Sequence, residues 1–282
     1  MLFIVWVFVF CLFFWKALEH LLHYALNNAN ASHILLVPLI VAWLLYQDRT
    51  EIAGHTSFDL PAALALAVPA LLLTVTSLWV FSSRADTKLS LLIASLVLFL
   101  IVGFVGIFGR AASKGVWFSL ALLGFAIPLP ESLLNRIIHI LQLGSAAVAE
   151  QIFDWSGVPV LREDFVFHLP GLSIEVAREC SGIRSSIALI ILALLVAHFS
   201  FSKLWKKAAF VFAGLLMMVI KNGIRIATLT ILAKYVDPSF LYGRLHHEGG
   251  VVFFLIGLGL LIPVYLLLKR GETTSPGRER TI

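Results

Sequence analysis

Long apolar segments separated by short polar connections dominate this chain of 282 residues. A helix needs about 20 consecutive apolar residues to cross the hydrocarbon core of a bilayer. The sequence therefore predicts an all-α polytopic membrane protein with about eight transmembrane helices, near residues 2–15, 32–46, 60–81, 89–108, 115–130, 182–201, 204–220 and 250–268. Residues 222–235 are apolar enough to continue the seventh helix or to fold back into the membrane.

The composition agrees with a membrane protein and excludes other classes. Hydrophobic residues make up 60% of the chain and charged residues 13%, whereas a soluble domain carries about 25% charged residues. This balance excludes a cytosolic enzyme, a disordered protein and a nucleic-acid binder, although the net charge is +5. The two cysteines exclude a disulfide-rich scaffold.

Lysine and arginine residues in the connections predict the orientation of the helices. Lys203, Lys206 and Lys207 crowd the short turn between the sixth and seventh predicted helices, which places that turn in the cytoplasm. With an even number of spans, both termini then lie in the cytoplasm and residues 131–179 lie outside.

We expect one integral-membrane domain over residues 1–270, with an extracytoplasmic insertion at 132–178 and a short cytoplasmic tail at 271–282. Polar residues recur at helical spacing from Leu133 to Ile152, which indicates an amphipathic helix along the outer interface. The alternative is a ninth, polar-lined span, which would invert the topology of everything after it. Further on, Phe165–Phe167 and Ser173–Val176 flank a proline–glycine turn signal, so a small β-hairpin outside the bilayer is predicted.

Cys180 is the first candidate for chemistry, because it lies at the start of the sixth predicted helix and therefore at the outer membrane boundary. The positive charges of Arg178 and Arg184 and the helix N-terminus favour the thiolate form, which is the nucleophile. Gly182 allows another backbone to approach closely. A free cysteine is more often a small buried hydrophobe, and we assign that packing role to Cys11.

Arg225 is the second candidate, because a permanent charge in apolar sequence must face a protein interior, a polar cavity or the interface. Its guanidinium presents a fixed fork of donors suited to an oxyanion or to proton handling. Asn222 lies three residues earlier on the same helical face, so its amide is placed to hold the guanidinium. The alternative is snorkelling towards the lipid headgroups, which fits Lys221 and Lys234 better.

His246 and His247 are the third candidates, at the outer mouth of the last predicted helix. Histidine transfers protons near neutral pH and can orient a thiolate. The alternatives are interfacial polar caps or, together with Glu248, a metal site. Since no second cluster of ligands is in view, no metal and no cofactor are expected.

The stretches around these candidates resemble the exosortase/archaeosortase family of membrane-embedded cysteine transpeptidases. They are Glu179-Cys180-Ser181-Gly182-Ile183-Arg184-Ser185, Asn222-Gly223-Ile224-Arg225-Ile226 and His246-His247-Glu248-Gly249-Gly250, with Ser32-His33 and Pro38 as an earlier signature. Each motif is short, but the three occur in the family's order, each at the outer end of a hydrophobic helix. The resemblance extends from about residue 30 to residue 268.

The resemblance implies that Cys180, Arg225 and His246 are catalytic, with His246 preferred because Gly250 follows four positions later, as in the family pattern. Arg184, Asn222 and His247 are then expected to bind substrate. The implied partners are membrane-anchored proteins with a C-terminal sorting signal, made of a short motif, a transmembrane helix and a basic tail. The implied location is the prokaryotic cytoplasmic membrane, with the active site facing outward.

The expected reaction is cleavage of the signal through an acyl-thioester on Cys180, followed by transfer to an acceptor amine or to water. A competing interpretation is a non-enzymatic transporter that uses Arg225 and the histidines in its pathway. The charged groups gather at one face of the membrane and no internal repeat is evident, which favours the enzyme. A membrane acyltransferase with the same thiol chemistry is a third interpretation.

Overall fold

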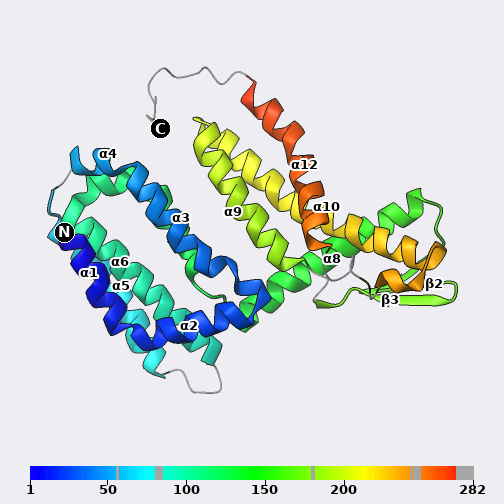
Figure 1. Cartoon of the computed structure of the whole chain (residues 1–282), viewed down its shortest axis with the longest axis horizontal. Coiled ribbons are helices and arrows are strands. Elements are labelled where there is room, and N and C mark those ends of the chain that lie inside the picture. The colour runs from blue at the N-terminus through cyan, green and yellow to red at the C-terminus, as the bar shows by residue number, and fades with distance from the viewer. Residues whose placement is uncertain (55–56, 80–84, 179–181, 242, 244–248, 271–282) are drawn as a thin grey trace. The chain divides into compact units, whose positions relative to one another are not determined.

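A computed structural model describes residues 1–54, 57–79, 85–178, 182–241, 243 and 249–270 (Figure 1). The chain folds as two compact units, Met1–Asn135 and Arg136–Ile282, and each is described by itself. Helices dominate both units, so the predicted all-α membrane architecture is confirmed.

The first unit is built around a long helix, α6, which contacts α5 most extensively and also α1 and α2. Phe14 separates α1 from α2, whose axes are bent by 78°. Within α6, Gly109 adopts φ +81°, which interrupts the helix where the fourth predicted span ends. The elements of this unit are α1 (Leu2–Phe13), α2 (Trp15–Asn27), η1 (Ala29–Ala31), α3 (His33–Gln47), α4 (Arg49–Gly54), α5 (Leu60–Trp79), α6 (Ala85–Gly115), α7 (Trp117–Leu122) and η3 (Leu123–Ala126).

The second unit combines three mutually contacting helices, α9, α10 and α12, with a small sheet (Figure 1). A long helix, α8, begins at Glu131 in the first unit and supplies the face on which the sheet packs. The elements are α8 (Glu131–Trp155), β1 (Leu161–Glu163), β2 (Val166–Leu169), β3 (Leu172–Glu175), α9 (Ile183–Ser200), α10 (Leu204–Tyr235), η5 (Pro238–Leu241) and α12 (Gly250–Lys269).

The sheet is antiparallel with the order β1-β2-β3, and Leu169 pairs with Leu172 across the hairpin turn. Gly171 adopts φ +79° in this turn, a conformation that glycine reaches without steric cost. The predicted hairpin is therefore confirmed, whereas β1 was not predicted. Phe167 and Leu169 alternate inward from β2 and pack on α8 and α10 in one buried cluster.

Replacing Phe167 by alanine tests how strongly this cluster holds the second unit together. Phe167 is completely buried and contacts Phe153 of α8 edge-on, with 5.2 Å between ring centroids. Loss of a buried phenylalanine costs about 3–5 kcal/mol, so thermal unfolding in detergent should begin at a clearly lower temperature. Leu161→Ala, on the exposed face of β1, is the control and should leave the unfolding curve unchanged. Equal curves for the two variants would contradict a stabilising role of the cluster.

Six helices are long and apolar enough to cross a membrane, or seven if α1 and α2 count as one bent span, among the described residues. The predicted number of eight is therefore not confirmed. The predicted span at 115–130 is divided into α7 and the 3₁₀ turn η3, and α3 has only 15 residues. Residues 222–235 continue α10 instead of folding back. The helix α8 meets the same length and hydropathy criterion, so a ninth, polar-lined span stays an alternative to the interfacial helix.

Candidate active site

The helix α10 extends well beyond the thickness of a bilayer. Its 32 residues span about 48 Å at 1.5 Å per residue, whereas the hydrocarbon core is about 30 Å thick. Arg225 lies about 30 Å along the helix from Leu204, close to the level at which a helix entering at Leu204 leaves the core. The following residues pack on the sheet, since Ile226 and Ala227 belong to its buried cluster.

Gly182 forms the N-terminal boundary of α9 in a left-handed conformation, with φ +68° and ψ +18°. Its carbonyl oxygen accepts hydrogen bonds from the Ser186 amide at 2.9 Å and from the Ser185 hydroxyl at 3.0 Å. A Cβ atom on Gly182 would lie 2.7 Å from Asn222 Oδ1 and 3.3 Å from Lys221 Nζ. The backbone at the start of α9 is thus pressed directly against two polar side chains of α10.

Asn222 links α10 to α8. Its Nδ2 donates to the Ser145 hydroxyl at 3.0 Å, and the side chain is almost completely buried. The opposite end of the amide, Oδ1, faces Gly182. This double contact explains why a residue in the middle of a membrane helix is polar. Substrate binding by Asn222 stays a prediction.

Lys221 does not snorkel towards the headgroups, so that interpretation was wrong for this residue. Its side chain is 1% exposed, and its Nζ donates to Ser185 Oγ at 2.6 Å. The aliphatic stem lies against Gly257 of α12, where an added Cβ would be 3.1 Å from Lys221 Cδ. Lys234, the other lysine so interpreted, donates to the Pro170 carbonyl in the hairpin turn.

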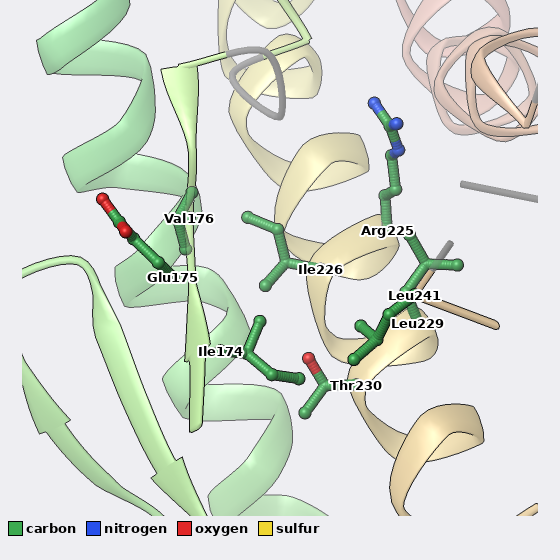
Figure 2. A pocket seen from close by; sticks show the side chains of 8 residues that line it. All are labelled: Ile174, Glu175, Val176, Arg225, Ile226, Leu229, Thr230 and Leu241. Atoms are coloured by element: carbon green, nitrogen blue, oxygen red, sulfur yellow. The ribbon is translucent and has the colours of Figure 1, made fainter. Parts of the chain in front are cut away.

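Arg225 lines a small recess between α10, the sheet and η5 (Figure 2). The recess has a volume of about 50 Å³, which is room for one small side chain and far below the size of a cofactor site. Figure 2 shows the Arg225 side chain extending away from the apolar residues that form the floor of the recess. The apolar lining residues are Ile174, Val176, Ile226, Leu229 and Leu241, with Thr230 and Glu175 beside them.

Three of the predicted site residues, Cys180, His246 and His247, lie outside the described residues. Arg184 is exposed on the first turn of α9, and Arg178 is exposed just before it. What the structure does bring together are the helices that follow or carry the three motifs: α9, α10 and α12 contact one another. In the described part of the chain, no three histidine, cysteine or carboxylate side chains gather in a way that could hold a metal ion.

Sequence reasoning missed Lys221 and its partner Ser185. The available signal was the position of Lys221 next to Asn222 and one helical turn before Arg225, which places it on the same face as Arg225. What the sequence did not reveal is that Gly257, far along the chain, opens the space that the lysine stem fills.

Comparison with protein families identifies the class of protein to which this chain belongs. The family model described as transmembrane exosortase (Exosortase_EpsH) matches residues 25–263, which is most of the chain. The chain belongs to the transmembrane exosortase family. The resemblance found in the three motifs is confirmed, and the matched range includes every predicted site residue. No curated protein and no solved structure matches the chain. As an exosortase, it is an integral membrane protein with a general role in transpeptidation and protein sorting.

Proposed function

We propose that this exosortase cleaves the C-terminal sorting signal of membrane-anchored proteins at Cys180 and transfers the new C-terminus to an acceptor. The Cys180 thiolate attacks a backbone carbonyl carbon, so a C–S bond forms and the peptide C–N bond breaks. The leaving amine takes a proton and departs with the signal's helix and basic tail. An acceptor amine or water then attacks the thioester, loses a proton and releases the thiolate.

The observation that most supports this proposal is the tight contact of Gly182 with Lys221 and Asn222. Only glycine permits both the left-handed backbone and the 2.7 Å approach of Asn222 Oδ1 to the position of a Cβ. The segment that follows the nucleophile is therefore anchored on α10, within about one helical turn of Arg225. A packing role for Cys180 alone would not require such a contact.

In the proposed mechanism, Arg225 stabilises the negative charge that develops on the attacked carbonyl oxygen, and His246 assists proton transfer. The active site would face the outer side of the cytoplasmic membrane. The basic turn Lys203–Lys207 and Arg225 lie at opposite ends of the membrane-crossing part of α10, and positive charge favours the cytoplasmic side. The substrate's own helix would reach the site by lateral diffusion in the bilayer.

Arg225→Ala should lower the rate of processing by about 10² to 10³-fold, the usual cost of removing one donor to a developing oxyanion. Arg225→Lys should recover only part of this loss, because an ammonium keeps the charge and lacks the planar fork of donors. Single-turnover cleavage of a reporter measures both effects. Arg162→Lys is the matched control, since Arg162 pairs with Glu150 at the edge of the sheet. Equal rates for Arg225→Ala and the control would remove Arg225 from the mechanism.

The proposal as a whole is tested by co-expression with a set of reporters that carry a C-terminal signal of motif, helix and basic tail. We expect a shortened product on a gel, with a new C-terminus located by mass spectrometry between motif and helix. Reporters without the helix or without the tail should remain intact, and a chain lacking the Cys180 thiol should leave every reporter uncut. Continued cleavage without that thiol would refute the proposal, and solute transport into vesicles by the same variant would support a transporter.

A further inference from the structure

Lys221 presents a buried charge that the proposed mechanism does not use. Its ammonium donates to Ser185 of α9, its aliphatic stem lies against Gly257 of α12, and its side chain is 1% exposed. Burying an unpaired charge is costly, so buried lysines are rare unless an anion or a function requires them. Within the described parts of the chain, no carboxylate forms an ion pair with Lys221.

Among the described residues, Lys221 has neighbours on α9, α10 and α12. On α9 it donates to Ser185, while Arg184 next to it is exposed. On its own helix, Arg225 lies four residues further along, on the same face of α10. On α12 the contact is Gly257, and the residues from Phe253 to Leu261 are apolar or glycine. Arg184 and Arg225, two charged side chains among the described neighbours of Lys221, are both positive.

A chain of hydrogen bonds leads from this ammonium to the peptide that follows the nucleophile. Lys221 Nζ donates to Ser185 Oγ, and Ser185 Oγ donates in turn to the Gly182 carbonyl oxygen. Successive bonds of this kind polarise and strengthen one another in a water-poor interior. Lys221 Nζ also lies 3.3 Å from where a Cβ of Gly182 would be, so the charge sits beside that residue.

We propose that Lys221 is a positioning residue for the transpeptidation, which fixes the Gly182 peptide through Ser185 and supplies positive charge that favours the thiolate form of Cys180. Covalent geometry alone keeps the Cα atom of Cys180 within about 7.6 Å of that of Gly182. An ammonium beside Gly182 is thus close enough to favour the thiolate, and the thiolate gives the buried charge its counter-ion. The expected effect of Lys221 on turnover rests on the proposed function. Its expected effect on the Cys180 thiol does not.

The test measures the rate at which iodoacetamide alkylates Cys180 as a function of pH, in the full chain with Cys11→Ala so that one thiol remains. Lys221→Gln keeps a donor for Ser185 and removes the charge. We expect it to raise the pH of half-maximal rate by about one unit or more, equivalent to about tenfold slower alkylation near pH 7. Lys234→Gln is the matched control on the same helix and should leave the profile unchanged.

Ser185→Ala separates the hydrogen-bond chain from the charge and is small enough to leave the fold intact. We expect about tenfold lower kcat for reporter cleavage, with an unchanged KM and an unchanged alkylation profile, because the Gly182 peptide loses its support. Wild-type kcat in Ser185→Ala would overturn the positioning role. An unchanged alkylation profile in Lys221→Gln would overturn the charge effect and point to Glu179 as the counter-ion.

These outcomes are distinct from a failure of the proposed function. If no reporter is cleaved by the wild-type chain but the alkylation profile shifts in Lys221→Gln, the proposed substrate is wrong and the role of Lys221 towards the thiol stands. If reporters are cleaved and the profile does not shift, the function stands and the inference about Lys221 falls.

Discussion

Cys180→Ala is expected to reduce reporter cleavage by at least about 10⁴-fold, to the background rate. Removal of a covalent nucleophile eliminates the intermediate, and the remaining groups of the site recover little of the lost rate. The reaction is followed as loss of the C-terminal helix and tail from the reporter. The variant should retain the unfolding temperature of the wild type, because the substitution removes only the sulfur atom from the side chain.

Cys11→Ala is the matched control for this prediction. Cys11 lies in α1 of the first unit, partly buried, and it should be replaceable without loss of cleavage. A chain in which Cys11→Ala is inactive and Cys180→Ala is active would reverse the assignment of the two thiols.

Gly182→Ala is expected to lower cleavage by about 10²-fold or more while the protein still inserts in the membrane. An L-residue in a left-handed conformation costs about 1–2 kcal/mol. The new methyl group would also lie 2.7 Å from Asn222 Oδ1, which is held in place through Ser145. Either α9 or the Asn222 side chain must therefore move, and a displacement of about 1 Å in a catalytic constellation costs about 10² in rate.

Gly259→Ala on α12 provides the comparison, because a Cβ at that position meets no atom within 4 Å. Both variants add one methyl group to a glycine of the same unit, and only Gly182→Ala should affect the initial rate of cleavage. Comparable activity of Gly182→Ala and Gly259→Ala would mean that the contact with α10 has no role in the reaction.

Much of the fold follows from local sequence patterns. The Pro170-Gly171 pair predicted the hairpin because a tight turn needs a residue that tolerates positive φ, and Gly171 has φ +79°. The predicted fourth span ended at residue 108, where Gly109 breaks α6. The predicted span at 115–130 is not confirmed, because hydropathy measures apolar length and does not register the 3₁₀ turn at Leu123–Ala126 that divides it.

The site was predictable where residue chemistry is visible in the sequence and not where it depends on distant packing. Motif spacing singled out Arg225 and Asn222, which the structure places on one helix, with Asn222 beside Gly182. The burial of Lys221 depends on Gly257 of α12, and no local sequence pattern predicts this contact. Nor did periodicity reveal that Ser145 of α8 accepts a hydrogen bond from Asn222, because the two residues are far apart in sequence.

The three-stranded sheet is attached to the helices of the second unit at three places. Gln142 of α8 donates to the Val176 carbonyl at 2.7 Å after β3, and Lys234 of α10 donates to Pro170 at the opposite end of that strand. Between these two hydrogen bonds, Phe167 packs in the buried cluster. To move as a flap, the sheet would have to break all three attachments at once. The sheet therefore forms a fixed surface. Under the proposed function, an incoming polypeptide would meet a fixed surface here, and the contour of that surface would help to select which chains are accepted.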